Sequence, residues 1–408
     1  MVNRGFGIEV EGTYGDTTVG TSSFDPDWWN HAESVDFKLN DDPVTRSGSS
    51  RMNKRARAGI MKPSGSTEAD ADLQQLAWYF FGYLDNYVYT EGDTGEPNTH
   101  EYYGGEGKEL PSFRAIVMYD MLKKYIYGML EDELKLEVSD ENMTVGAEWI
   151  YKTEKAAINE AFTEPDELTD EQIFIMFYDV SLKLNDTALD GVSTAFSFEG
   201  KNNHDVDGTI GLGSRYPQKR AQAGKRENTI TINTTLTSDT ARSILNAEYG
   251  EVNALSPSSC KLLQLPLEVN INHCENTDLS CKILFPKCNI HVQYSMSGVD
   301  SIEAELTLDT LGSAVVTLED GTTEVETDMY ICLVNNQEEI SKIDIFMRNI
   351  RSVKRLGIND IYNWCNRQNI AYKTTFHYHK ESSIWRNMQS YYHYSRQKLK
   401  YRAKLSTI

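Results

Sequence analysis

The chain has 408 residues, of which 39% are hydrophobic and 25% charged, and its formal net charge is -21 at pH 7. This length exceeds one compact core of usual size, so we expect two or more modules. The composition is globular, and no run approaches the roughly 20 apolar residues of a membrane helix, which predicts a soluble protein without membrane contact. The N-terminal residues lack the apolar stretch of a secretory signal, which predicts synthesis and assembly in a cytoplasm.

The charge is distributed unevenly along the chain. Residues 338–408 carry 14 Lys/Arg and 5 Asp/Glu, a net charge of +9, whereas residues 1–337 carry 26 and 56, a net charge of -30. The acidic part repels phosphate, which argues against nucleic-acid binding through it. The basic segment suits contact with nucleic acid, an anionic surface, or the acidic part of another copy.

Alternation of apolar and polar residues predicts a β-rich body, for example over 34–39, 134–138 and 229–233. Helical spacing of apolar residues is clearest at 70–84. A second helix is predicted at 238–249, where Ser238 and Asp239 are N-cap candidates.

These elements occur twice in the same order, about 160 residues apart, which predicts an internal duplication. The first set is a strand (35–39), a long basic loop, the 70–84 helix and paired strands (125–138, 144–151). The second is a strand (194–198), a long basic loop, a strand (229–236), the 238–249 helix and paired strands (283–296, 301–308). The alternative is two β domains that are alike by chance.

We therefore predict a mainly β chain of two tandem modules, each with a flanking helix. The first module spans 1–162 and the second spans 163–337, beginning with an acidic linker at 163–171. Residues 338–408 form a basic, Tyr-rich extension that contains helix. The two long loops concentrate the basic residues of the body, and these are our candidate site residues: Arg46, Arg51, Lys54, Arg55 and Arg57 in the first loop, and Arg215, Lys219, Arg220, Lys225 and Arg226 in the second.

No catalytic constellation is present: the sequence has no H-E-x-x-H, no phosphate loop, no G-x-S-x-G elbow and no G-x-G-x-x-G. We predict no enzyme activity and no cofactor. The six cysteines are interpreted as buried small hydrophobic residues. A zinc site from His273, Cys274, Cys281, Cys288 and His291 is an alternative, but paired C-x-x-C spacing is absent. The run 205–208 resembles the start of a calcium loop but lacks its Glu, and 377–379 is interpreted as strand, so no metal is expected.

Several runs carry a family resemblance through their order and spacing. They are 7–15 (GIEVEGTYG), Glu33-Ser34 before a strand, 62–66 (KPSGS) before a helix, 127–136 (YGMLEDELKL) and 221–232 (AQAGKRENTITI). In these features the chain resembles the tail tube proteins, also called major tail proteins, of long-tailed, siphovirus-like bacteriophages. The resemblance covers about residues 1–337.

The resemblance implies a β-sandwich or barrel with a flanking helix, and rings of six modules joined sheet edge to sheet edge. A chain with two modules would need three copies per ring, which predicts a trimer with pseudo-sixfold symmetry. The family's long loop reaches the adjacent ring, so the basic loops are expected to make inter-ring contacts, although plain solvated loops are the alternative. Implied partners are further copies of the chain, a tape measure protein and duplex DNA in the lumen, and tail terminator and distal tail proteins, all in the virion tail.

An acidic lumen would let DNA slide without the adhesion that basic walls create. One alternative is another tail ring component, such as a terminator or distal tail protein. A different alternative is a glycan-binding or adhesion protein, since the β-rich chain has 23 Tyr and 6 Trp.

Overall fold

The computed structural model describes residues 4–17, 26–30, 34–40, 44–46, 55–119, 122–139, 141–158, 174–185, 187–189, 193–235, 244, 264–297 and 301–340. They all belong to a unit spanning Met1–Asp344; a second unit, Ile345–Ile408, lies outside the described residues. Strands make up 58% of the described residues, and the one α-helix with bounds among them is α1 (Leu73–Tyr83). The predicted mainly β fold is confirmed. The predicted linker at 163–171 and the predicted extension from residue 341 onward lie outside the described residues.

The strands before residue 160 are β1 (Arg4–Val10), β2 (Trp28–Asn30), β3 (Ser34–Lys38), β4 (Val44–Arg46), β5 (Arg55–Arg57), β6 (Ser64–Asp70), β7 (Asn86–Thr90), β8 (Asn98–Tyr103), β9 (Phe113–Tyr119), β10 (Leu122–Val138), β11 (Met143–Ile150) and β12 (Thr153–Ile158). Those after it are β13 (Val180–Leu184), β14 (Thr187–Ala188), β15 (Ser193–Lys201), β16 (Glu227–Thr235), β17 (Leu265–Asn272), β18 (Ser280–Ser297), β19 (Ser301–Thr310), β20 (Ala314–Thr317), β21 (Glu324–Thr327) and β22 (Tyr330–Asn335). Short 3-10 turns occupy Phe177–Asp179 and Asp207–Thr209.

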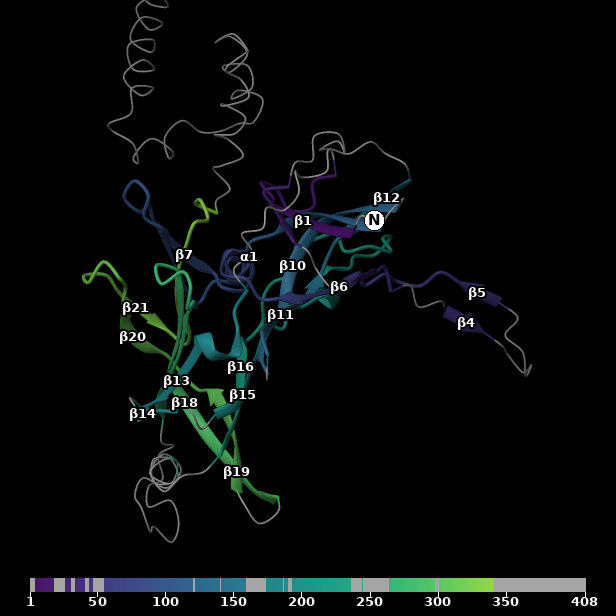
Figure 1. Ribbon diagram of the computed structural model, residues 1–408. Helices are drawn as coiled ribbons and strands as arrows, with labels where there is room; N and C mark the ends of the chain where they lie inside the picture. Colours follow the sequence, from purple (N-terminus) through teal and green to yellow (C-terminus); the bar gives the residue numbers. More distant parts are fainter. Residues whose placement is uncertain are drawn as a thin grey trace, which may run out of the picture. The chain divides into compact units, whose positions relative to one another are not determined.

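One antiparallel sheet runs through both halves of the described unit (Figure 1). Its strands lie in the order β3, β6, β11, the C-terminal half of β10, β15, β16, β19 and the C-terminal half of β18. The step from β10 to β15 joins the segments on either side of residue 163. We call these eight strands the continuous sheet. The division into modules at 163 stays a prediction.

The order of pairings is the same in the two halves. In the first, β9 lies between β1 and the N-terminal half of β10, β1 also pairs with β2, and β10 pairs with β12. In the second, β17 lies between β13 and the N-terminal half of β18, β13 also pairs with β14, and β18 pairs with β22. A further pairing, β22 with β8, connects the halves a second time, and β8 also pairs with β7.

The long strands β10 and β18 each contain a break in register at an equivalent place. In β10 it falls within 126–129, opposite β9, and in β18 within 285–288, opposite β17. Gly128 lies in the first break with φ +67°, and Pro286 lies in the second. Glycine accepts a left-handed bulge conformation, and proline inside a sheet is found at bulges or edges, so the residue types fit the geometry.

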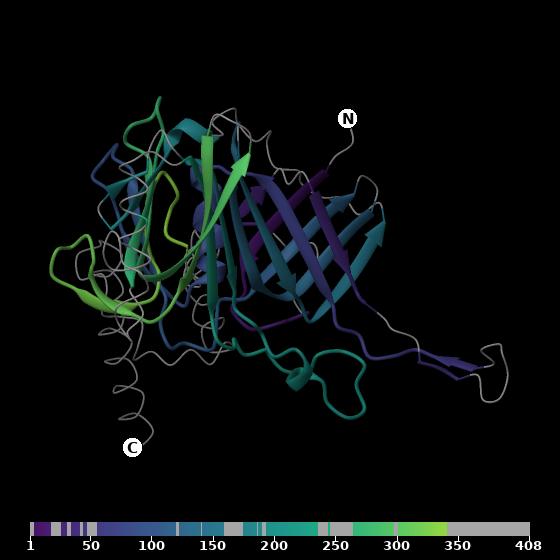
Figure 2. The ribbon, with the colours of Figure 1, turned by 90° about the horizontal axis from the view of Figure 1, so that it is seen from below.

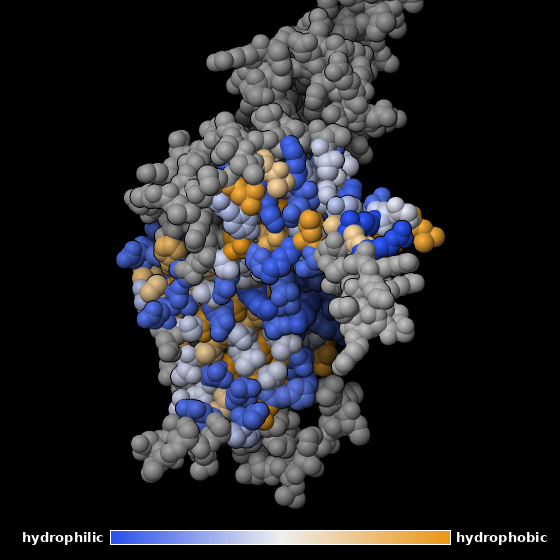
Figure 3. Space-filling view, turned by 90° about the vertical axis from the view of Figure 1, so that its right-hand side faces the viewer, coloured by the Kyte–Doolittle hydropathy of each residue, from blue (hydrophilic) through white to orange (hydrophobic). Residues whose placement is uncertain are grey.

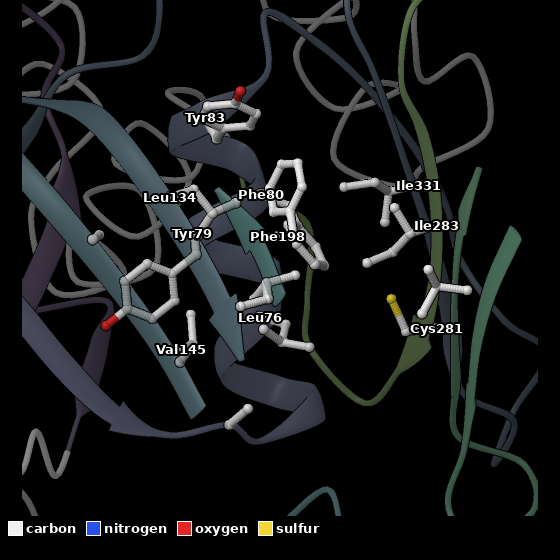
Figure 4. Close-up of a cluster of buried hydrophobic side chains, with 14 of the residues drawn as sticks. Leu76, Tyr79, Phe80, Tyr83, Leu134, Val145, Phe198, Cys281, Ile283 and Ile331 are labelled. Atoms are coloured by element: carbon white, nitrogen blue, oxygen red, sulfur yellow. The ribbon is translucent and has the colours of Figure 1, made fainter. Parts of the chain in front are cut away.

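The largest hydrophobic core cluster is shared by the two halves, and α1 lies in it (Figure 4). Leu76, Phe80 and Tyr83 of α1 are fully buried, and Phe198 of β15 and Ile331 of β22 belong to the same cluster. The helix begins where the Asp72 carboxylate accepts hydrogen bonds from the amides of residues 74 and 75, a standard N-cap arrangement.

Most strands predicted from alternation are present with shifts of a few residues, including β3, β10, β11, β15, β16, β18 and β19. Of the predicted 238–249 helix only residue 244 is described. The cysteine prediction holds for Cys281, Cys288 and Cys332, which are buried, but is wrong for Cys274, which is exposed in the loop between β17 and β18. Cys260 and Cys365 lie outside the described residues. In the part of the chain described, no helix is long and apolar enough to span a membrane.

Candidate functional site

The continuous sheet has one face in the core and one face directed away from it. Alternating side chains of each strand reach this outer face, because successive residues of a strand point to opposite sides. The acidic residues on it that are exposed or half-buried are Asp36, Glu68, Asp70, Glu137, Glu148, Glu199, Glu227, Glu303, Glu305 and Asp309. We call this surface the acidic sheet face.

The lysines of the acidic sheet face, Lys38, Lys135 and Lys201, are all paired with acids of the same face. Lys38 pairs with Asp36 of its own strand. The Lys135 ammonium contacts Glu133 and lies 3.7 Å from Glu148. The hydrogen bond to Glu133 raises the pKa of Lys135.

Lys201 completes this set, and its contacts cross the joint between β15 and β10. Its ammonium pairs with Glu199 and lies 3.6 Å from Glu133. The hydrogen bond to Glu199 raises the pKa of Lys201, so the lysine stays charged. With its described cations engaged locally, the acidic sheet face carries a surplus of carboxylates.

Small neutral side chains, for example Ser197, Thr229, Thr231 and Thr307, fill much of the rest of the acidic sheet face, and Asn233, Asn289, His291 and Gln293 also lie on it. Among the described residues there is no group of three or more His, Cys, Asp and Glu placed to hold a metal ion. The carboxylates are distributed over many strands, an arrangement that provides a negative potential over an area. Figure 3 shows one side of the molecule, on which hydrophilic residues predominate and hydrophobic ones form only small groups.

The two basic loops predicted from sequence lie side by side (Figure 2). The amide of Met61 donates to the carbonyl of Arg215 at 2.8 Å, and the Arg215 guanidinium donates to the Gly59 carbonyl at 2.9 Å. The Lys62 ammonium lies 2.5 Å from the carboxylate of Asp207, a residue of the run that resembles a calcium loop. The C-terminal base of the first loop is therefore held against the middle of the second loop.

The first basic loop forms a projecting hairpin of β4 and β5, in which Arg46 lies opposite Arg55. Arg57, at the end of β5, is exposed. Arg51 and Lys54 lie outside the described residues. The hairpin thus places its arginine positions away from the continuous sheet.

Some basic side chains of the second basic loop are exposed to solvent, and others contact the rest of the chain. Lys219 and Lys225 are exposed. The Arg220 guanidinium lies 5.9 Å from the centroid of the Tyr14 ring. Arg220 is half-buried, and burial lowers its pKa.

Arg226 is the most strongly bound of the predicted site residues. Its Nε and Nη2 donate to the two carboxylate oxygens of Asp328 at 3.1 and 2.9 Å, and its Nη1 lies 3.5 Å from Asp85. The bidentate geometry and the largely buried side chain of Arg226, 12% exposed, make this a contact that holds the loop to the body. Sequence reasoning missed both acids, because they are distant in the chain and nothing in their local patterns marks them.

Comparison with models of known protein families and with curated proteins gives no match to this chain.

Proposed function

We propose that the protein is a structural, non-enzymatic subunit of a virus tail tube, with the acidic sheet face lining the channel through which duplex DNA passes. The observation that carries this proposal is the surplus of carboxylates on a broad sheet whose described lysines are all engaged by neighbouring acids. The described lysines of such a wall are not available to phosphates, so DNA can move along it without salt-dependent adhesion.

The repeated order of strand pairings supports two tandem tail-tube-type modules in one chain. Six modules enclose the channel in tubes of this kind, so the proposed ring contains three copies and has pseudo-sixfold symmetry. The joint between β10 and β15 is the module contact within a chain. A non-identical contact joins neighbouring chains.

Stacking of rings is assigned to the paired basic loops. Arg57, Lys219 and Lys225 are exposed cations beside a protein body of strongly negative charge, so an adjacent ring offers acidic surface for them. Arg226 contributes indirectly, because its bonds to Asp328 hold the base of the second loop.

The proposed partners follow from this placement in a virion tail. Copies of the chain form the tube, a tape measure protein and then DNA occupy the lumen, and terminator and distal tail proteins bind its ends. Assembly takes place in the host cytoplasm.

Electron microscopy of the purified protein in negative stain tests the proposal. We expect ordered stacks of rings with a stain-filled channel, and no retention of added duplex DNA. A protein that stays monomeric and binds glycans would contradict the proposal and favour an adhesion function.

A further inference from the structure

The continuous sheet ends in two edges within the described residues. At one end the outer edge of β3 pairs with no described strand, and at the other the same is true of β18 beyond residue 288. Tyr294 of this part of β18 is 45% exposed, although its neighbour Val292 packs against the core. A sheet edge with an exposed aromatic ring is a surface that a further strand can cover.

The joint inside the chain shows how such an edge is covered. There β15 pairs antiparallel with the C-terminal half of β10, and Leu136 lies opposite Phe198. Leu136 is fully buried. Because β10 corresponds to β18 and β15 to β3 in the repeated order of pairings, the β10–β15 joint is a template for a contact between copies.

The register of that contact follows from the bulges. The break at 126–129 of β10 matches the break at 285–288 of β18. A second break after Glu131 adds one residue to β10, whereas β18 pairs regularly with β19. Counting onward from the shared bulge, Leu136 corresponds to Tyr294.

Following the cross-strand pairs from β10 and β18 gives the corresponding residues of β3 and β15. One row across the first four strands consists of Val35, Thr67, Ala147 and Leu134. The matching row of the second four consists of Phe196, Ile232, Leu306 and Val292. Val35 therefore corresponds to Phe196, and Phe37 corresponds to Phe198.

We propose that the C-terminal half of β18 pairs antiparallel with β3 of a second copy of this chain, with Tyr294 opposite Phe37. This register, which rests on the proposed ring of copies, also places Gln293 opposite Lys38 on the acidic sheet face. The face then continues from one copy to the next without a break.

The edge of β3 is suited to pairing with a strand of another copy. In the single chain the carbonyls of Val35 and Phe37 accept hydrogen bonds from the Tyr119 hydroxyl at 3.3 Å and the Lys124 ammonium at 2.9 Å. Side chains that satisfy an open edge protect it until a partner strand supplies backbone donors. The outer-face pair Gln293 and Lys38 brings no like charges together.

Cysteine pairs in the full-length protein test the register. Residues directly opposite in an antiparallel pair have Cα atoms about 4.5–5.5 Å apart, within disulfide range, whereas a shift of two residues places them about 7–8 Å apart, beyond it. The test pair is Lys38→Cys with Gln293→Cys, and the shifted control is Lys38→Cys with His291→Cys. The pair Lys135→Cys with Glu199→Cys, its counterpart at the β10–β15 joint, is the positive control within one chain.

We expect the test pair to give disulfides between copies on non-reducing gels, mapped to residues 38 and 293 by mass spectrometry, the shifted pair to give none, and the positive control to close within the chain. Tubes that form without the 38–293 disulfide, or with the shifted disulfide instead, would overturn the inferred register and leave the proposed function standing. A protein that forms no assembly would overturn both.

Discussion

Lys201 and Glu133 face each other across the joint between the two halves of the protein, with the Lys201 Nζ 3.6 Å from a Glu133 carboxylate oxygen. In the inferred contact between copies, Asn40 takes the place of Lys201 and His291 takes the place of Glu133, because the two halves correspond in this way. The joint within the chain therefore has a charged pair that the joint between chains lacks. The two contacts around the proposed ring are similar in backbone pairing and different in side chains.

The first prediction concerns the acidic sheet face. Replacing Glu137 and Glu305 with Lys adds cations to the proposed channel wall, so tubes of this variant should retain duplex DNA that wild-type tubes release. Binding should weaken with salt, with a slope in log–log form of roughly -0.9 for each phosphate neutralised. The matched control replaces the exposed residues Glu275 and Glu324, away from that face, with Lys. Equal DNA retention by both variants would show that the acidic sheet face does not line the lumen.

The second prediction concerns the basic loops. Charge reversal at Arg57 and Lys219 should shorten the stacks and make them more sensitive to salt, while rings remain closed, because both side chains are exposed and not part of the sheet. Tube length by electron microscopy and ring mass by native mass spectrometry separate the two effects. Tubes of unchanged length and salt resistance would count against an inter-ring role.

The third prediction concerns Arg226. Its replacement by Met leaves the carboxylates of Asp328 and Asp85 without their guanidinium partner, which should destabilise the fold by about 3 kcal/mol. The measurement is the midpoint of thermal or denaturant unfolding. Lys225→Met, at the adjacent exposed position, is the control and should change it little. A midpoint equal to wild type in R226M would show that the ion pair does not hold the loop.

The fourth prediction concerns Glu11. Burial raises the pKa of this carboxyl to about 7, against opposing hydrogen bonds from the amides of Gly15 and Gly128, each at 2.8 Å. The folded state therefore favours the neutral acid. The contribution of protonated Glu11 to the free energy of unfolding is complete below the unfolded pKa of about 4.5 and is lost as pH rises to about 7. Glu11→Gln should remove this part of the pH dependence, about 3 kcal/mol. Parallel curves of unfolding midpoint against pH for the two proteins would contradict it.

Sequence reasoning succeeded where a local pattern decides the structure. Alternating residues predicted strands such as β16, whose Ile230 and Ile232 are fully buried, and helical spacing predicted α1. Strands with continuous apolar runs, such as β9 and β22, were missed because such runs lack the two-residue period. The ion pair of Arg226 and Asp328 was also missed, because long-range contacts leave no local signal. The excess of acidic residues was predicted from composition. Their location on one sheet face could not be predicted, because it depends on the order of the strands in the sheet.

The rotational symmetry of the ring tests the central claim most directly. Class averages of tube cross-sections, together with the mass of an isolated ring, give the symmetry and the number of chains. We predict three chains per ring, with threefold symmetry and six similar lobes around an open channel, since each chain supplies two modules. Strict sixfold symmetry with six chains per ring, or a purified protein that forms no ring, would contradict it.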